Sequence, residues 1–506
     1  MRRFLTWASL TIVWLIAATT IHAQSPSSTS PAQLFEAFNA AWEDNRWADA
    51  AEAGEALSAH VVFGDQPISL QFSVLVRLGA AYQWSDQDDA ALAAYVAAQA
   101  IQPESALPYF WRSFLHLGND DWDRSAQDMM QVARRSVDLF NEYDLRTLGR
   151  IIRELDRADE AELSRNLRTT LVDYYVPENP FTTLDYYRSR SARDLALDGD
   201  RVGARAIIQQ MRTAAPFFML QSDITFDFLW AEPWFIAASD MQAAFENELE
   251  QTELLIAEHP EFLDGHRQRI RILMSLGRFD EAESVAASAF DRLSGGEPFT
   301  DAEEYTTWLL NDWAYALYAS GRTDEGNQRL AQAANFSESG ELNVSQTINY
   351  ASMLNAQGRP AESLEVIARM RDRSASSYGD MWTWAVSACA HYQLGQTAEA
   401  DDVLAQMSAN WEDNPAAYQR TLICMSRMDE AADLLIARLS NPDHTEGALE
   451  ALQRLLPIYP DESFGLSNAW LNAVDELAER PDVQAALAPV GRVQTFEIHS
   501  LYWGTF

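Results

Sequence analysis

Apolar and small residues recur along the chain in a pattern about 34 residues long. Steps of three and four residues place the first members on one face of a helix, and small residues further on let a second helix pack closely against it. A proline near the end of the pattern stops the second helix. The pattern therefore predicts pairs of antiparallel helices. It is clearest in residues 72–105, at Leu75, Leu78, Gly79, Tyr82, Ala91, Tyr95, Ala98 and Pro103.

The same pattern returns along most of the chain between Pro31 and Asp443, and predicts about ten such hairpins with irregular spacers. Several copies carry a glycine where the first helix must turn into the second, followed by an acidic and a small residue. Copies are marked by Trp47 with Ala50; Trp122 with Ser125; Gly149, Asp159, Glu160 and Ala161; Gly199 with Ala204; Gly277, Glu281 and Ala282; Gly321 with Glu325; Gly358 with Glu362; Gly395, Glu399 and Ala400; and Asp429, Glu430 and Ala431.

In these residues the chain resembles the tetratricopeptide repeat proteins. The resemblance implies an all-α fold, a right-handed superhelical solenoid in which each hairpin buries its apolar stripe against its neighbours. It also implies a groove, lined by the first helix of each hairpin, that binds a protein or peptide partner.

Two stretches interrupt the pattern in the same way, residues 226–255 and 470–491. They resemble the blocks that close the tetratricopeptide half of bacterial signalling proteins with a winged-helix or cyclase domain. The chain departs from those proteins by having an apolar N-terminus in place of the effector domain. We therefore expect neither transcriptional nor cyclase activity. From the positions of the two stretches we expect a first lobe over 32–240, a second lobe over 241–443, and capping helices with a tail over 444–506.

The first residues are typical of a secretory signal peptide. Two arginines precede an apolar run from Phe4 to Ile21, and Ile21-His22-Ala23 ends it with a small residue. We expect residues 1–23 to be removed, residues 24–31 to form a flexible linker, and the rest to be exported to a bacterial periplasm. The alternative is that residues 4–21 remain as an inner-membrane anchor, since their length is just sufficient to span a bilayer.

Charge narrows the choice of partner. The chain has 75 acidic residues against 37 basic ones, a net charge of -38, and every basic residue is arginine. Nucleic acids and anionic lipids are polyanions, so neither is expected as a partner. The absence of lysine excludes lysine Schiff bases and phosphate-loop lysines.

Catalytic patterns are missing from the sequence. The eight histidines form no pair at metal-ligand spacing, and the two cysteines are far apart, so we expect no metal, no cofactor and no enzyme activity. The alternative is an α/α-type hydrolase or lyase acting on envelope polysaccharide, with acidic residues beside Trp308 or Trp382 as general acid and base. It would require a deep pocket in which two carboxylates face each other.

The candidate partner-binding residues occupy the places that turn away from the second helix of each hairpin. Arginines at these places suit a carboxylate, such as an acidic segment or a C-terminus. The alternative is that they pair within the protein with neighbours such as Glu154 and Asp194. The arginines are Arg146, Arg150, Arg153, Arg193, Arg267 and Arg271.

A second group at groove places is aromatic, accompanied by Asn311 and Asn355. Rigid rings with a few amides suit an extended peptide or a sugar strand. The alternative is that the rings pack between adjacent hairpins. The aromatic residues are Trp308, Tyr315, Tyr318, Trp382 and Tyr392.

The remaining features are the cysteines and the tail. Cys389 and Cys424 fall on successive first helices, so they form either a disulfide or two buried thiols. In the tail, residues 493–506, apolar residues alternate with other residues, and we expect the tail to dock on the last hairpin. Together these observations favour a non-catalytic periplasmic scaffold with a protein or peptide partner, and a further alternative is the sensor portion of a membrane-anchored signalling complex.

Overall fold

The computed structural model describes residues 30–296, 299–338, 341–370, 376–459 and 463–499. These residues are almost entirely helical, so the predicted all-α fold of helical hairpins is confirmed. The chain divides into two compact units, residues 1–142 and 143–506, which we call unit 1 and unit 2. The predicted signal segment, residues 1–23, lies outside the described residues.

A repeated turn explains why the sequence forms hairpins. Each first helix ends in one residue with a left-handed backbone, such as Gly277 with φ 71°. The amide of the next residue, Arg278, donates to the carbonyl of Leu273 at 2.8 Å, and the same bond recurs from turn to turn. This is the Schellman arrangement that satisfies the last carbonyls of a helix.

Five residues after the left-handed residue of each hairpin turn lies a small buried residue at the crossing of the two helices. Alanine or glycine allows the close approach, and where serine stands there its hydroxyl reaches back to the first helix, as Ser363 Oγ does to the Ala351 carbonyl at 2.7 Å. The ten pairs in the described residues are Asn45/Ala50, Asp86/Ala91, Asp120/Ser125, Asp159/Ser164, Gly199/Ala204, Gly277/Ala282, Gly321/Gly326, Gly358/Ser363, Gly395/Ala400 and Ser426/Ala431.

One predicted crossing is wrong by three residues. Ala161 is exposed, and Ser164 occupies the crossing in its place. The sequence Asp159-Glu160-Ala161 imitates the Asp280-Glu281-Ala282 of a later hairpin. Asp159 itself is the left-handed residue, with φ 60°, so the crossing falls five residues after it.

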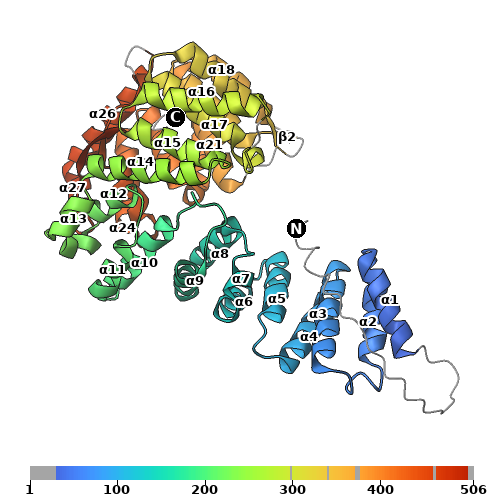
Figure 1. Ribbon diagram of the computed structural model, residues 1–506. Helices are drawn as coiled ribbons and strands as arrows, with labels where there is room; N and C mark the ends of the chain where they lie inside the picture. Colours follow the sequence, from blue (N-terminus) through green and yellow to red (C-terminus); the bar gives the residue numbers. More distant parts are fainter. Residues whose placement is uncertain (1–29, 297–298, 339–340, 371–375, 460–462, 500–506) are drawn as a thin grey trace, which may run out of the picture. The chain divides into compact units, whose positions relative to one another are not determined.

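Unit 1 contains three hairpins and a short closing helix. Figure 1 shows their helices side by side from α1 to α6, and each helix contacts the next. The core contains the fully buried side chains of Phe38 and Tyr95. The helices are α1 (Pro31–Glu43), α2 (Trp47–Ser58), α3 (Ile68–Trp84), α4 (Asp88–Ile101), α5 (Leu107–Gly118), α6 (Trp122–Arg135) and α7 (Val137–Phe140).

Unit 2 contains seven hairpins, interrupted after the second by α12, a 3-10 helix, α13 and the long α14. The hairpin helices are α8 (Leu145–Arg157), α9 (Ala161–Tyr174), α10 (Asp185–Leu197), α11 (Arg201–Ile208), α15 (Leu263–Ser275), α16 (Phe279–Ser294), α17 (Ala302–Ala319), α18 (Thr323–Asn335), α19 (Val344–Ala356), α20 (Pro360–Ile367), α21 (Ser377–Gln393), α22 (Thr397–Ala409), α23 (Pro415–Cys424) and α24 (Met428–Ser440). The interruption comprises α12 (Pro216–Ser222), η2 (Ile224–Leu229), α13 (Pro233–Ala238) and α14 (Met241–Glu258).

Short elements complete unit 2 among the described residues. Strands β1 and β2 form an antiparallel pair after α18, whereas β3 and β4 pair in parallel. They are β1 (Ser337–Glu338), β2 (Glu341–Leu342), η3 (Ala368–Met370), η4 (Trp411–Asp413), α25 (Pro442–Ala451), β3 (Arg454–Leu456), α26 (Gly465–Glu479), α27 (Pro481–Leu487) and β4 (Thr495–His499).

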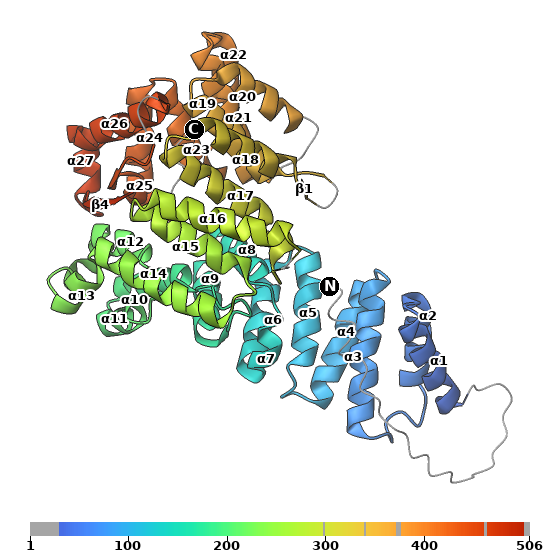
Figure 2. The same ribbon diagram turned by 45° about the horizontal axis from the view of Figure 1, so that its top comes forward.

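The C-terminal segment, residues 454–499, returns to the beginning of unit 2. Figure 2 shows α26 and α27 beside α24, which they contact. Beyond them the Arg492 amide donates to the Ser222 carbonyl at 2.9 Å, and Phe496 packs against Phe218 with 4.8 Å between ring centroids. The described part of the tail, residues 493–499, therefore pairs with β3 and contacts α14 and α15, whereas the sequence pointed to the last hairpin. Residues 500–506 lie outside the described residues.

The boundary expected at residue 240 falls inside unit 2. One hydrophobic core runs there from Ala192 on α10, through Phe245 on α14, to Ile498 on β4. The residues between α11 and α15 thus belong to a continuous core.

Candidate functional site

The clearest cavity in the described residues lies in unit 2, between α15, α17 and the chain that follows β3. Its volume is about 250 Å³. The predicted residues Arg267, Arg271, Trp308 and Tyr315 all line it. The complete lining is Arg267, Ile270, Arg271, Met274, Trp308, Asp312, Tyr315, Ile458 and Tyr459.

Arg267 is a fixed part of the wall. Its guanidinium contacts Asp264 through Nη1 at 3.2 Å and Asp312 through Nε at 3.1 Å, and the residue is 7% exposed. It also lies over the rings of Tyr305 and Trp308, 5.0 and 5.8 Å from their centroids. Two carboxylates balance its charge, so the internal-pairing alternative holds for this arginine.

Arg271 lies one turn further along α15 and is half-buried. Its electrostatic neighbours include Glu248 and Asp264. Within the described residues, the structure records no hydrogen bond or ion pair for its guanidinium. Arg271 therefore presents its donor groups to the cavity, whereas the donor groups of Arg267 are already bonded to Asp264 and Asp312.

The aromatic wall comes from α17 and the C-terminal segment. Tyr315 and Tyr459 are buried, and burial raises the pKa of both phenols, so both remain protonated at neutral pH. Trp308 is half-buried beside them. The wall is thus uncharged and rigid, and suits a flat apolar group.

Tyr318 lies next to this wall but does not line the cavity. It is fully buried, and Tyr459 and Phe464 pack against it edge to face at centroid distances of 6.3 and 5.3 Å. Its hydroxyl donates to Asn327 Oδ1 at 2.9 Å. The C-terminal segment therefore covers the surface that the sequence assigns to a partner at this position.

The arginines of α8 have a different environment. Arg146, Arg150 and Arg153 are exposed and share one face of the helix, at spacings of four and three residues. Arg146 forms an ion pair with Glu304, in which the side chains are 74% and 43% exposed. By contrast, Arg193 on α10 contacts the buried Asp223 at 2.7 Å. The structure thus separates the exposed arginines of α8 from Arg193, which is bonded to a buried carboxylate.

The carboxylates proposed as internal partners of these arginines are used by others. Glu154 pairs with Arg157 at 3.0 Å, and Asp194 pairs with Arg168 at 2.7 Å. Glu154 and Asp194 are therefore paired within the protein, but with arginines other than the six named from the sequence.

The two aromatic residues predicted on α21 are half-buried packing residues. The guanidinium of Arg420 lies 5.2 Å from the ring centroid of Trp382, and Tyr392 packs against a core that includes residues of α21 to α27. The amides expected beside them are buried: Asn311 Oδ1 accepts from Asn349 at 3.0 Å, and Asn355 donates to the Val386 carbonyl at 2.8 Å. These amides fix neighbouring helices to each other.

Cys389 on α21 and Cys424 at the end of α23 form a disulfide, with 5.9 Å between their Cα atoms. The two first helices contact each other directly, which brings the thiols together. Of the two states that the sequence left open, a disulfide or two buried thiols, the structure shows the disulfide.

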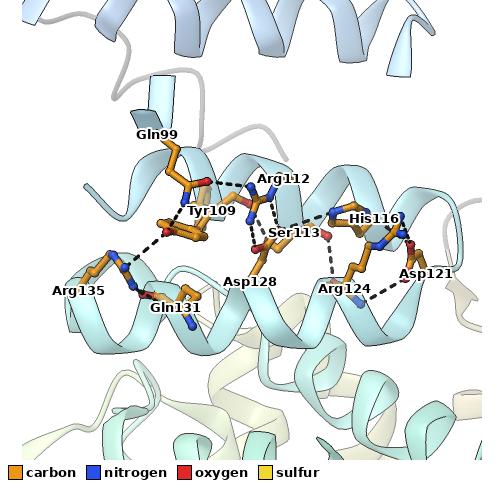
Figure 3. Close-up of polar contacts among 12 residues, drawn as sticks. Gln99, Tyr109, Arg112, Ser113, His116, Asp121, Arg124, Asp128, Gln131 and Arg135 are labelled. Atoms are coloured by element: carbon orange, nitrogen blue, oxygen red, sulfur yellow. Dashed lines mark hydrogen bonds and ion pairs between the residues drawn. The ribbon is translucent and has the colours of Figure 1, made fainter. Parts of the chain in front are cut away.

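A polar network that sequence reasoning missed lies in unit 1, between α4, α5 and α6 (Figure 3). Arg112 Nε donates to Asp128 at 2.7 Å, and Arg112 Nη1 donates to Gln99 at 2.9 Å. His116 lies 3.7 Å from both Asp121 and Asp128, and burial lowers its pKa. Arg112 and His116 are one turn apart on α5, a spacing that could have signalled a shared partner on α6.

This network joins helices and shows no features of a catalytic centre. Asp128 is 4% exposed and already bonded to Arg112. In the described part of the chain, no group of three or more His, Cys, Asp or Glu side chains is arranged to hold a metal ion. We therefore interpret the network as a structural link between hairpins.

The cavity in unit 2 also lacks the arrangement that the hydrolase alternative requires. Asp312 is the single carboxylate among its lining residues, and it is bonded to Arg267. General acid and base catalysis of glycoside cleavage needs two carboxyl groups flanking the bond.

The described helices include none that is long and apolar enough to cross a membrane.

Comparisons with known proteins leave the family open. No protein-family model matches the chain, and no curated protein matches it. Among solved structures, the chain is similar to yeast Tom70, with 11% identity over 91% of this chain and 99% of that chain, at a TM-score of 0.34. It is also similar to a Naa15/Naa10 structure bound to HypK-THB, with 14% identity over 91% of this chain and 68% of that chain, at a TM-score of 0.24. Scores this low carry no argument about function.

Proposed function

We propose that the chain is a non-catalytic scaffold of the bacterial periplasm that binds an acidic segment or C-terminus of a protein partner along α8. The observation that carries the proposal is the row of exposed guanidinium groups at Arg146, Arg150 and Arg153. A guanidinium binds a carboxylate through two parallel hydrogen bonds, so a row of them suits a run of acidic residues.

The exposed pair between Arg146 and Glu304 is compatible with this role. Ion pairs between exposed side chains contribute about 0–1 kcal/mol, so a partner carboxylate can replace Glu304 at small cost. The overall negative charge of the chain limits binding of acidic segments to places where arginines are concentrated. Binding should therefore weaken as salt concentration rises.

The test is the double variant Arg146→Ala with Arg150→Ala, used to capture partners from periplasmic extract. We expect about a tenfold loss of captured partner, because each of the two exposed ionic contacts contributes up to about 1 kcal/mol, and unchanged helicity by circular dichroism. The matched control is Arg165→Ala with Arg201→Ala, which removes the same charge from a half-buried position on α9 and an exposed position on α11. Equal capture by the double variant and wild type would reject the role of α8.

Export is tested separately. The basic and apolar N-terminus supports cleavage after Ala23. N-terminal sequencing of protein from the cell envelope should begin at Gln24. A start at Met1 would instead support the membrane-anchored sensor.

A further inference from the structure

The cavity of unit 2 combines one uncommitted cationic group with an apolar interior. Of its polar lining residues, Arg267 and Asp312 are bonded to each other. Arg271 is the charged group of the lining that is left to meet a ligand. The other lining residues are aliphatic or aromatic: Ile270, Met274, Trp308, Tyr315, Ile458 and Tyr459.

Charge near Arg271 does not block an anion. Asp264 is held by Arg267 at 3.2 Å and by hydrogen bonds from Gln268 and Asn179. Glu248 accepts the Ala214 amide at 2.7 Å, and burial raises its pKa to about 7, so at neutral pH it carries only part of a charge. The guanidinium of Arg271 can therefore satisfy its donors best with a carboxylate brought by a ligand.

The size of the cavity restricts the rest of the ligand. A dry cavity of about 150 Å³ holds benzene, whereas drug-sized ligands occupy about 300 Å³ or more. A volume of about 250 Å³ therefore fits one ring or a short branched chain with an acid group. Trp308, Tyr315 and Tyr459 supply flat surfaces for such a body.

The C-terminal segment excludes a long ligand. Ile458 and Tyr459 form one wall of the cavity, and Phe464 with Tyr459 covers the neighbouring Tyr318. An extended peptide would have to displace these side chains, of which Tyr459 and Phe464 are buried. The cavity therefore accepts a compact molecule.

We infer that the cavity between α15, α17 and residues 458–459 binds a small organic acid, consisting of one carboxylate on an apolar body about the size of a single ring. The carboxylate binds Arg271, and the body lies among Trp308, Tyr315 and Tyr459. This inference goes beyond the scaffold function, which rests on α8, and its test needs no protein partner.

The experiment is calorimetric titration of the full exported chain with phenylacetate and with its neutral isostere phenylacetamide. We expect phenylacetate to bind with a dissociation constant of about 1 mM or lower. Arg271→Gln should weaken binding ten- to a hundredfold, the range expected for loss of a charged hydrogen bond. The matched control is Arg269→Gln on the same helix, which pairs with Glu253 at 2.8 Å and does not line the cavity.

Several results would overturn the inference: no binding of phenylacetate, equal binding by Arg271→Gln, or equal binding of the acid and the amide. The comparison of acid with amide uses wild-type protein, so the test survives if Arg271→Gln fails to fold. N-acetyl-Gly-Phe with a free carboxylate serves as a second probe. Tighter binding of this peptide than of phenylacetate would also overturn it, and would assign the cavity to a protein C-terminus.

Discussion

Glu248 shows how one half-buried side chain makes stability depend on pH. It lies on α14, where its carboxylate accepts the Ala214 amide and faces Asp185 and Arg271. Removal from water disfavours the charged form and raises its pKa from 4.5 to about 7. The folded protein therefore holds this proton more tightly than the unfolded chain does.

We expect the free energy of unfolding of unit 2 to fall as pH rises from about 4.5 to about 7. A carboxyl whose pKa is raised by folding contributes its stability below the unfolded value and loses it as pH passes the folded value. Glu248→Gln can still accept the Ala214 amide, and it should remove this part of the slope. Urea unfolding from pH 4.5 to 8 measures the difference between the two proteins, and identical slopes would contradict the prediction.

For single residues, the sequence predicted where a side chain lies better than it predicted which side chain it bonds to. It assigned Arg267 and Arg271 to one group of groove residues and Trp308 and Tyr315 to another, and the structure brings all four to one cavity. It could not show that Arg267 is bonded to Asp264 and Asp312, because those contacts depend on side-chain conformations in two helices.

The helical hairpin is built around its turn. One left-handed residue ends the first helix, and a small residue five positions later sets the crossing, as Gly395 and Ala400 do. Glycine adopts this backbone without strain, whereas other L-residues do so at a cost of about 1–2 kcal/mol. Five of the ten turns nevertheless use Asn, Asp or Ser.

Exchange of turn residues should change stability in opposite directions. Ser426 has φ 59° and is exposed, so Ser426→Gly should stabilise unit 2 by about 0.5–1 kcal/mol once the greater chain entropy of glycine is subtracted. Gly395→Ser, at φ 73°, should destabilise it by a similar amount. Urea midpoints of both variants test this, and a shift in the same direction for both would refute it.

The turn also explains one sequence error. Asp159-Glu160-Ala161 matches the letters of Asp280-Glu281-Ala282, but the first triplet begins at the left-handed residue and the second begins three residues after it. Helix periodicity alone does not fix which residue turns, because aspartate is accepted at both places.

At the scale of the whole chain, the repeats and the C-terminal segment obey different rules. Each hairpin is encoded locally, so its existence could be predicted from about 34 residues. The return of residues 454–499 to the helices near the start of unit 2 could not be predicted. Nothing in the pattern of these residues indicates that Phe464 contacts Tyr318 or that Arg492 bonds to Ser222. Such contacts depend on the accumulated geometry of all intervening hairpins.

Phe464→Ala tests the part played by this segment. Phe464 is fully buried against Tyr318 and Tyr459, so its loss should destabilise unit 2 by about 3–5 kcal/mol. Hydrogen exchange should accelerate in α17 and α19 and stay unchanged in α3 to α6 of unit 1. Acceleration confined to residues 463–479 would mean that the hairpins do not need the segment.

The bonds between Arg492 and residues 221–222 also affect how unit 2 responds to mechanical force. A linear array of hairpins lengthens gradually when its ends are pulled, because each hairpin contacts only its neighbours. In unit 2, residues 490–492 are bonded to residues 221–224, so the array between them cannot be extended until those backbone bonds break. Tension on a tethered partner would then be resisted elastically at first and released in one abrupt step.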